Sequence, residues 1–378
     1  MSNPKKIWLS SPHMGENEQK YVRDAFESNW VAPLGPNVDG FEKAIEDYTQ
    51  CGHVAALTTG TSAIHLALIL LGVKPEDEVI CSSFTFSASC NPIIYQGAIP
   101  VFIDSEKDTW NMCPVLLRQA IEDRMSKGKK PKAIILVHLY GMPAKMDEIL
   151  VICNEFDIPL IEDAAEALGS SYKKQSMGTF GKFGILSFNG NKIITTSGGG
   201  ALLSADEELI KKARFLATQA RDNAPHYQHT HIGFNYRMSN ICAGIGMGQM
   251  EVLSQRIEQK RNIFNTYKTA LADIDGIKFV LEPTPDYFSN YWLTTIVVEN
   301  NSKNVNRETI RLALEKENIE SRPLWKPMHL QPVFEEYPAY TNGVSEDLFE
   351  KGLCLPSDSK MTEEDIQRVI KIIRDLFS

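Results

Sequence analysis

The first two-thirds of the chain alternate between short apolar runs and longer helical patterns, and this alternation restricts the fold more than any other feature. The apolar runs are rich in Val, Ile and Leu and lie at residues 53–59, 77–83, 99–104, 132–138 and 158–163. Such runs indicate strands buried on both faces, as in a parallel sheet. Helical patterns lie between them at residues 61–72, 114–125 and 146–157. The alternation predicts an open α/β sheet with helices on both sides.

The last third of the chain has a different pattern. A helix-compatible stretch runs from Met238 to Ala272, and its three interior glycines indicate close packing against another element. Beyond it, two strand-like and two amphipathic helical segments predict a smaller α+β domain. We therefore expect a large α/β domain at residues 1–255, with an N-terminal arm, and a small C-terminal domain at residues 256–378. With 43% hydrophobic residues, the chain can bury a large core.

Charge and cysteine usage argue against several classes of function. The formal net charge is −9, and no basic run extends beyond the short patch Lys127–Lys132, so nucleic acid is not expected as a partner. No apolar run reaches the roughly 18 residues of a membrane span, and the N-terminus lacks a signal-peptide core. The seven cysteines form no C-x-x-C pair, which favours reduced thiols in a cytoplasmic protein.

Two polar motifs directly follow predicted strands. In TTGTSAIHLAL (58–68), free backbone N–H groups at a helix start, with the hydroxyls of Thr61 and Ser62, predict an anion site. An ordinary helix cap would give the same pattern. Asp163 follows the apolar run IPLIE, which places a carboxylate at the carboxyl end of a buried strand, where it needs a partner. A loop-capping aspartate is the alternative.

The third motif is SFNGNKIITTSGGG (187–200), in which Lys192 stands among small hydroxyl residues, amides and glycines. A solvated surface lysine is one interpretation, but these neighbours leave room for a ligand. An anion site, a strand-end aspartate and a lysine on a later strand are together the parts that hold pyridoxal phosphate (PLP). The phosphate would bind at the helix start, and Asp163 would keep the ring nitrogen protonated. Lys192 would form a Schiff base with the aldehyde and later transfer protons.

The sequence resembles the DegT/DnrJ/StrS family of PLP-dependent nucleotide-sugar aminotransferases over nearly its whole length. The motifs that carry the resemblance are TTGTSAIHLAL, SSFTFSAS, VHLYG, IEDAAEALGS, SFNGNKIITTSGGG and GFNYRMSN. The resemblance implies a fold-type I (aspartate aminotransferase-like) architecture and a homodimer with shared active sites. It also implies that Lys192 forms the Schiff base and that further residues bind the cofactor: Asp163 at the ring nitrogen, Phe86 on the ring face, Gly60, Thr61 and Ser187 at the phosphate, and Asn235 at the phosphate of the neighbouring subunit.

Within the family, the sequence is most similar to transaminases that aminate C4 of a UDP-linked 4-keto-6-deoxy-N-acetylglucosamine, with glutamate as donor. The segments LSSPHMGENEQKYV, NWVAPLGPNVDGFE and ESRPLWKPMH carry this closer likeness. It implies a product of the bacillosamine type, used in bacterial glycan assembly and protein glycosylation. Arg237 is the candidate for the diphosphate, because its planar guanidinium suits phosphate oxygens. Trp325 and His329 are the candidates for further substrate contacts.

The sequence departs from the family pattern at two places. Ser197–Gly200 stands where many members have Gly-Glu-Gly-Gly, and Glu166 stands where many have glutamine. An ionised glutamate can only accept hydrogen bonds, so we expect Glu166 either to be protonated or to face the substrate. Lysine at position 192 favours amino transfer, whereas histidine there would have indicated the family's dehydratases.

Three alternatives stay open. The enzyme could act on another nucleotide-linked 3- or 4-keto sugar, or the chain could be a catalytically silent regulator that binds PLP or a sugar nucleotide. A dinucleotide-binding oxidoreductase is disfavoured because no G-x-G-x-x-G follows the first buried strand. His226, His229 and His231 have no cysteine or acid at a metal-ligand spacing, so no metal is expected.

Overall fold

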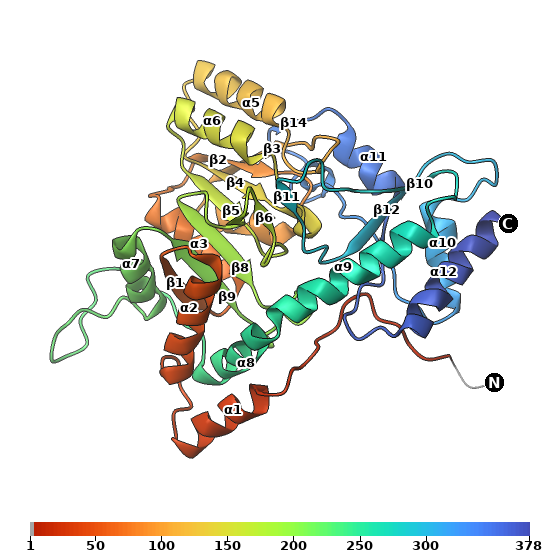
Figure 1. Cartoon of the computed structure of the whole chain (residues 1–378). Coiled ribbons are helices and arrows are strands. Elements are labelled where there is room, and N and C mark those ends of the chain that lie inside the picture. The colour runs from red at the N-terminus through yellow and green to blue at the C-terminus, as the bar shows by residue number, and fades with distance from the viewer. Residues whose placement is uncertain (1–3) are drawn as a thin grey trace.

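The computed structural model describes residues 4–378, and an eight-stranded sheet forms its centre (Figure 1). The strand order is β1-β9-β8-β5-β4-β2-β3-β14. The strands are β1 (His53–Leu57), β2 (Glu78–Ser82), β3 (Ile99–Ile103), β4 (Ala133–Val137), β5 (Leu160–Asp163), β8 (Phe183–Ser187), β9 (Gly200–Ser204) and β14 (Ala339–Tyr340). The five predicted apolar runs become β1 to β5, and β3, β2, β4, β5 and β8 pair in parallel.

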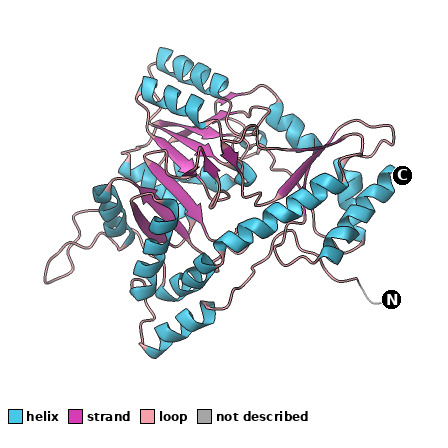
Figure 2. Cartoon of the chain, in the orientation of Figure 1, coloured by secondary structure: helices cyan, strands magenta, loops and turns pink. Residues whose placement is uncertain are grey.

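Helices cover both faces of this sheet, because successive residues of a strand point to opposite sides. On β1, Val54 and Ala56 belong to one hydrophobic cluster, whereas Ala55 and Leu57 belong to another. The first cluster includes α2 (Pro36–Thr49), α5 (Pro114–Ser126) and α6 (Met146–Phe156), and the second includes α3 (Gly60–Leu70), α4 (Asn91–Tyr95) and α7 (Glu207–Ala217). Figure 2 shows the magenta sheet between cyan helices, which is the predicted arrangement.

The C-terminal part of the chain builds a smaller antiparallel sheet with the order β10-β12-β15-β13. Its strands are β10 (Ile277–Phe279), β12 (Thr294–Val298), β13 (Arg322–Pro323) and β15 (Gly352–Leu355). The helices of this part are α10 (Arg307–Lys316), α11 (Val344–Lys351) and α12 (Glu363–Phe377). The long helix α9 (Leu253–Ala270) leads from the large sheet to the small one (Figure 1). A short ribbon of β11 (Tyr287–Phe288), β6 (Ser171–Tyr172) and β7 (Gln175–Ser176) completes the described strands.

The large sheet is mixed, within the mixed or parallel sheet expected for the fold class, because β9 runs antiparallel to both β1 and β8. Two connections were not predicted from the sequence. β14 comes from the C-terminal third of the chain but pairs in parallel with β3. Ile7, in the N-terminal arm, forms a bridge with Ile319 and belongs to the hydrophobic cluster of the small sheet. The predicted boundary at residues 255 and 256 falls inside α9, and it stays a prediction.

The predicted helix from Met238 to Ala272 is two helices, α8 (Asn240–Glu251) and α9, separated at Val252. The three glycines of α8 pack closely on α1 (Glu18–Glu27) and α2. This is the close contact that three glycines inside one helix predicted. A Cβ atom at Gly246 would lie 2.7 Å from the ring of Phe41, and one at Gly248 would lie 2.6 Å from the backbone nitrogen of Glu18. Side chains larger than hydrogen would therefore separate α8 from its neighbours.

Replacement of Gly248 by alanine is expected to lower the free energy of unfolding by about 1–3 kcal/mol, because the added methyl group meets backbone that cannot turn away. Gly40→Ala is the matched control: Gly40 is also helical, but its nearest neighbour is the flexible side chain of Met247, with the sulfur at 3.1 Å. We expect little loss there. Chemical unfolding of both variants measures the difference, and equal losses would contradict the packing explanation.

All seven cysteines are free thiols. Within residues 4–378, no helix has both the length and the apolar character needed to cross a membrane.

Candidate active site

A cavity at the carboxyl edge of the large sheet collects most of the predicted site residues. This is the edge at which open α/β sheets bind ligands. The neighbouring strands β5 and β8 end there in Asp163 and Ser187, and α3 begins there. The cavity is lined by Thr59, Gly60, Thr61, Phe86, Ser89, Asp163, Glu166, Ser187, Asn191, Lys192, Trp292 and Trp325, among others.

Lys192 lies in the loop between β8 and β9, and its side chain is only 12% exposed. Its Nζ atom is 3.3 Å from Oε1 of Glu166 and 4.3 Å from the centre of the Trp292 ring. The lysine is therefore directed into the cavity and not into solvent. Of the two interpretations of the sequence, a surface lysine and a ligand-binding lysine, this position favours the second.

Glu166 is the immediate polar partner of Lys192. Its second carboxylate oxygen, Oε2, accepts a hydrogen bond of 2.7 Å from the backbone N–H of Tyr140. Burial raises the pKa of Glu166, and the nearby Lys192 ammonium and the Tyr140 N–H partly oppose that rise. A carboxyl group in this position is protonated at a higher pH than an exposed glutamate.

We expect the absorbance of the cofactor-loaded protein to change with pH in the mildly acidic range, above the ordinary glutamate pKa of about 4.3. The direction follows from the raised pKa of Glu166, because its proton is lost only as the pH rises through that range. In Glu166→Gln this step should be missing, since an amide does not titrate. A spectrophotometric titration of both proteins tests this, and superimposable curves would show that Glu166 does not titrate near the cofactor.

Asp163 is held by two hydrogen bonds. The Ser89 hydroxyl donates to Oδ2 at 2.7 Å, and the backbone N–H of Ala165 donates to Oδ1 at 3.2 Å. Ser89 Oγ also lies 2.8 Å from Oγ1 of Thr85, and Ser89 and Thr85 are buried. These protein hydrogen bonds orient the carboxylate at the edge of the cavity.

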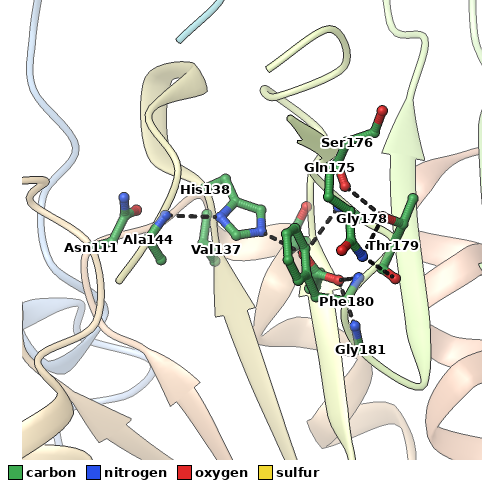
Figure 3. A network of polar contacts seen from close by, with 12 residues as sticks. Asn111, Val137, His138, Ala144, Gln175, Ser176, Gly178, Thr179, Phe180 and Gly181 are labelled. Atoms are coloured by element: carbon green, nitrogen blue, oxygen red, sulfur yellow. Dashed lines mark hydrogen bonds and ion pairs between the residues drawn. The ribbon is translucent and has the colours of Figure 1, made fainter. Parts of the chain in front are cut away.

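The residue before Asp163 anchors the same strand from the other face of the sheet. Glu162 is fully buried, and its carboxylate accepts hydrogen bonds from the N–H groups of Gly178 (3.0 Å), Phe180 (2.6 Å) and Gly181 (2.6 Å). Nε2 of His138 lies 3.0 Å from Glu162 Oε2, and Nδ1 accepts from the N–H of Ala144 at 3.2 Å. Figure 3 shows His138 between Ala144 and the loop at 178–181. The network fixes the end of β5.

The start of α3 differs from the prediction in one detail. Thr59 is the capping residue, and its hydroxyl accepts from the N–H of Ser62 at 3.0 Å while Ser62 Oγ accepts from the N–H of Thr59 at 3.0 Å. The Ser62 hydroxyl therefore serves the helix cap and not the predicted anion site. The N–H groups of Gly60 and Thr61 lie in the first turn, where a helix provides no partner for them. They and Ser187 line the cavity. Gly200 packs closely against this turn, since a Cβ atom there would lie 2.3 Å from the backbone nitrogen of Gly60.

The structure does not bring all predicted residues to the cavity. Arg237 is buried, and its Nη1 atom is 3.0 Å from a carboxylate oxygen of Glu42, so the predicted diphosphate contact is not available in this arrangement. His329 is not a lining residue either: Nδ1 is 2.6 Å from Ser83 Oγ, and Nε2 is 3.3 Å from Glu346. Asn235 is exposed and forms a bridge with Thr218, away from the lining residues.

Phe86 and Trp325 do line the cavity, with ring centres 5.4 Å apart. Sequence reasoning missed Ser89, Tyr140 and Trp292. Ser89 and Tyr140 stand inside the motifs SSFTFSAS and VHLYG, which were singled out, but no pattern in the sequence places Trp292 beside Lys192. Across residues 4–378, no cluster of three or more histidine, cysteine, aspartate or glutamate side chains could hold a metal ion.

The set of groups in this cavity fits PLP: glycines and free N–H groups at a helix start for a phosphate, a buried carboxylate for a ring nitrogen, and an amine for an aldehyde. Fold and site thus define a PLP-dependent enzyme. Comparison with known proteins gives the family, because residues 12–374 match the DegT/DnrJ/EryC1/StrS aminotransferase family. The chain belongs to this family of fold-type I enzymes and is a PLP-dependent sugar aminotransferase.

Three relatives illustrate the match. EpsN of Bacillus subtilis (strain 168), provisionally described as a pyridoxal phosphate-dependent aminotransferase, is 54% identical over 99% of this chain and 96% of its own. GDP-perosamine synthase of Escherichia coli O157:H7 is 35% identical over 99% of both chains. The PLP form of Spr1654 from Streptococcus pneumoniae, provisionally called a sugar aminotransferase, superposes with a TM-score of 0.89 at 27% identity, over 99% of this chain and 100% of that one.

Proposed function

We propose that Lys192 is the residue that joins the PLP aldehyde and that Asp163 holds the proton on the ring nitrogen. The observation that carries this proposal is that both side chains line one cavity together with the first turn of α3. Gly60, Thr61 and Ser187 would bind the phosphate, Phe86 would cover the ring, and Glu166 would contact the cofactor beside Lys192.

When bound, PLP supplies an aldehyde that accepts the amino group and a cationic ring that accepts the electrons of the broken C–H bond. Asp163 stabilises the positive charge of that ring. Lys192, once released by the incoming amine, would take the proton from the α-carbon of glutamate and pass it to the cofactor, and addition of water would then release glutamate as its 2-oxo acid and leave the amino group on the cofactor. In the second half-reaction Lys192 would carry the proton back from the cofactor to the sugar carbon that receives the amine, and the sugar's keto oxygen would leave as water.

The substrate that we propose is a UDP-linked 4-keto-6-deoxy-N-acetylglucosamine, aminated at C4. Two of the three segments that resemble enzymes of this specificity lie beside the cavity. Trp325, from ESRPLWKPMH, lines it. In the N-terminal segment, the Ser10 hydroxyl donates to the carbonyl of Asn191 at 3.1 Å, and a Cβ on Gly190 would be 3.9 Å from Pro12. Both segments are therefore placed to affect which sugar enters.

A comparison of kcat/KM for UDP-, GDP- and dTDP-linked 4-keto-6-deoxy sugars tests the specificity, with glutamate as donor in every case. The proposal expects the UDP-N-acetyl sugar to be preferred by at least about 10²-fold, the ratio that a few lost polar contacts produce. A GDP-linked keto sugar is the second candidate, because GDP-perosamine synthase is 35% identical to this chain. Preference for the GDP sugar would reject the UDP assignment without affecting amino transfer.

We also propose that two copies of the chain form each pair of active sites. The segment NWVAPLGPNVDGFE exposes Trp30 (49%), Val31 (50%) and Leu34 (47%), which is an unusual amount of apolar surface in one loop. Asn235 is exposed as well, so it is accessible to a second chain. Light scattering that gives the mass of one chain, about 42.4 kDa, would contradict this.

Addition of glutamate to the PLP-loaded protein tests amino transfer directly against the catalytically silent regulator that the sequence alone left open. An aminotransferase converts the cofactor to its amine form and changes its absorbance, whereas a silent protein does not. The seven free thiols support a reducing compartment, and we propose the cytoplasm as the place of action.

A further inference from the structure

A row of four aromatic rings leads through the wall of the cavity to Lys192. The ring of Phe86 lies 5.4 Å from that of Trp325, which stacks on Tyr140 at 6.1 Å with an angle of 10°. Tyr140 stacks in turn on Trp292 at 6.5 Å and 16°. The last ring, Trp292, has Nζ of Lys192 over its face at 4.3 Å.

Trp292 is fixed on several sides. Its backbone N–H donates to Oδ1 of Asn290 at 2.8 Å, and its carbonyl accepts from the fully buried Lys260 ammonium at 3.0 Å. Its indole N–H donates to the carbonyl of Asn191, the residue before Lys192, at 2.8 Å. The side chain is 1% exposed. These contacts hold the ring in place independently of Lys192.

The Lys192 ammonium has few partners other than this ring. Its side chain is 12% exposed, and its one hydrogen-bonded carboxylate is Glu166 at 3.3 Å. The other titratable groups around it are Asp163 in the cavity lining, Tyr140, whose N–H donates to Glu166, and Lys260, whose ammonium donates to the Trp292 carbonyl. A cation over the face of tryptophan is attracted by the negative face of the ring, and more strongly where water is scarce.

We propose that Trp292 is a positioning residue for Lys192: its ring and the Glu166 carboxylate together hold the ammonium whenever Lys192 is not joined to the cofactor. This inference rests on the proposed function, in which Lys192 releases the cofactor and carries a proton in both half-reactions. The ring then keeps the free amine at the place from which it must act and return. A π face stabilises only the charged form of an amine, so loss of the ring favours the neutral, nucleophilic form.

The test is the rate at which cofactor-free protein captures PLP, followed by absorbance as a function of pH. Loss of the ring in Trp292→Leu removes a partner of the ammonium, so the profile should move to lower pH. Trp292→Phe keeps a smaller π face and should move less than half as far. Trp110→Leu is the matched control, because Trp110 is also buried (7% exposed) but does not line the cavity, and its profile should not move.

A purely structural role of Trp292 would lower stability without this graded shift. Profiles of Trp292→Leu and Trp292→Phe that coincide with the wild type would overturn the proposal. If the leucine variant does not fold, replacement of all five tryptophans by 5-fluorotryptophan weakens the ring charge at constant shape, and the absence of any shift would be equally decisive. Borohydride reduction and peptide mapping of the wild type come first: a label on another residue would reject the proposed function itself, not the placement of Trp292.

Discussion

Lys192→Ala is expected to reduce the rate of amino transfer by at least about 10²–10⁴-fold, the range that loss of a single proton-transferring side chain produces. In the proposed function the lysine also supplies the amine that holds the cofactor aldehyde, so the loss should lie at the upper end. The variant should still bind PLP, because the proposed phosphate and ring contacts at α3 and Asp163 are unchanged. Borohydride should no longer attach the cofactor covalently.

Lys182→Ala provides the control for this experiment. Lys182 lies close in sequence, but its side chain is 45% exposed and pairs with Asp206 at 3.1 Å. It does not line the cavity. Activity should stay near the wild-type value there. Full turnover by Lys192→Ala would remove the chemical basis of the proposed function.

Asp163→Asn is expected to lower kcat by about 10³-fold. An ion pair in a partly buried site is worth about 4 kcal/mol at an effective dielectric constant near 20, and about 1.4 kcal/mol corresponds to a factor of ten in rate. The amide keeps the shape and can keep the hydrogen bond from Ser89. It cannot stabilise a protonated ring nitrogen, so the cofactor loses its ability to accept electrons.

The pH dependence of the cofactor spectrum and of kcat distinguishes this loss from a folding defect. Asp157→Asn is a matched control, since Asp157 is exposed at the end of α6 with φ of 49°, a conformation that asparagine tolerates well. That variant should be active. If Asp163→Asn retained most of its kcat, the partner of the ring nitrogen would have to be sought elsewhere.

Much of the site could be predicted because it depends on local sequence and on sheet topology. Asp163 and Ser187 each end an apolar run, and parallel strands that are neighbours bring such residues to the same edge. The three glycines in the sequence of α8 likewise indicated that this helix packs closely against another element. In these cases a pattern within one short segment is enough to show that a residue ends a strand or that a helix face packs closely, although it does not name the partner segment.

The parts that were missed depend on contacts between distant segments. Trp292 lies 100 residues after Lys192 (292 minus 192), in a stretch predicted only as a strand. Arg237 was assigned to a ligand because its guanidinium suits phosphate, but its partner, Glu42, is an internal carboxylate that sequence does not identify. β14 has two residues, which is too short for a hydrophobic period to show.

The short strand β14 also has a consequence for how the chain is made. Its neighbour β3 is synthesised early, yet the N–H of Phe102 finds its acceptor, the carbonyl of Pro338 at 2.8 Å, only near the C-terminus. Domains emerging from the ribosome commonly fold in order, N-terminal part first. Here the outer edge of β3 stays unpaired until residues 338–340 have been made, so a nascent chain that stalls earlier presents an open strand to its surroundings.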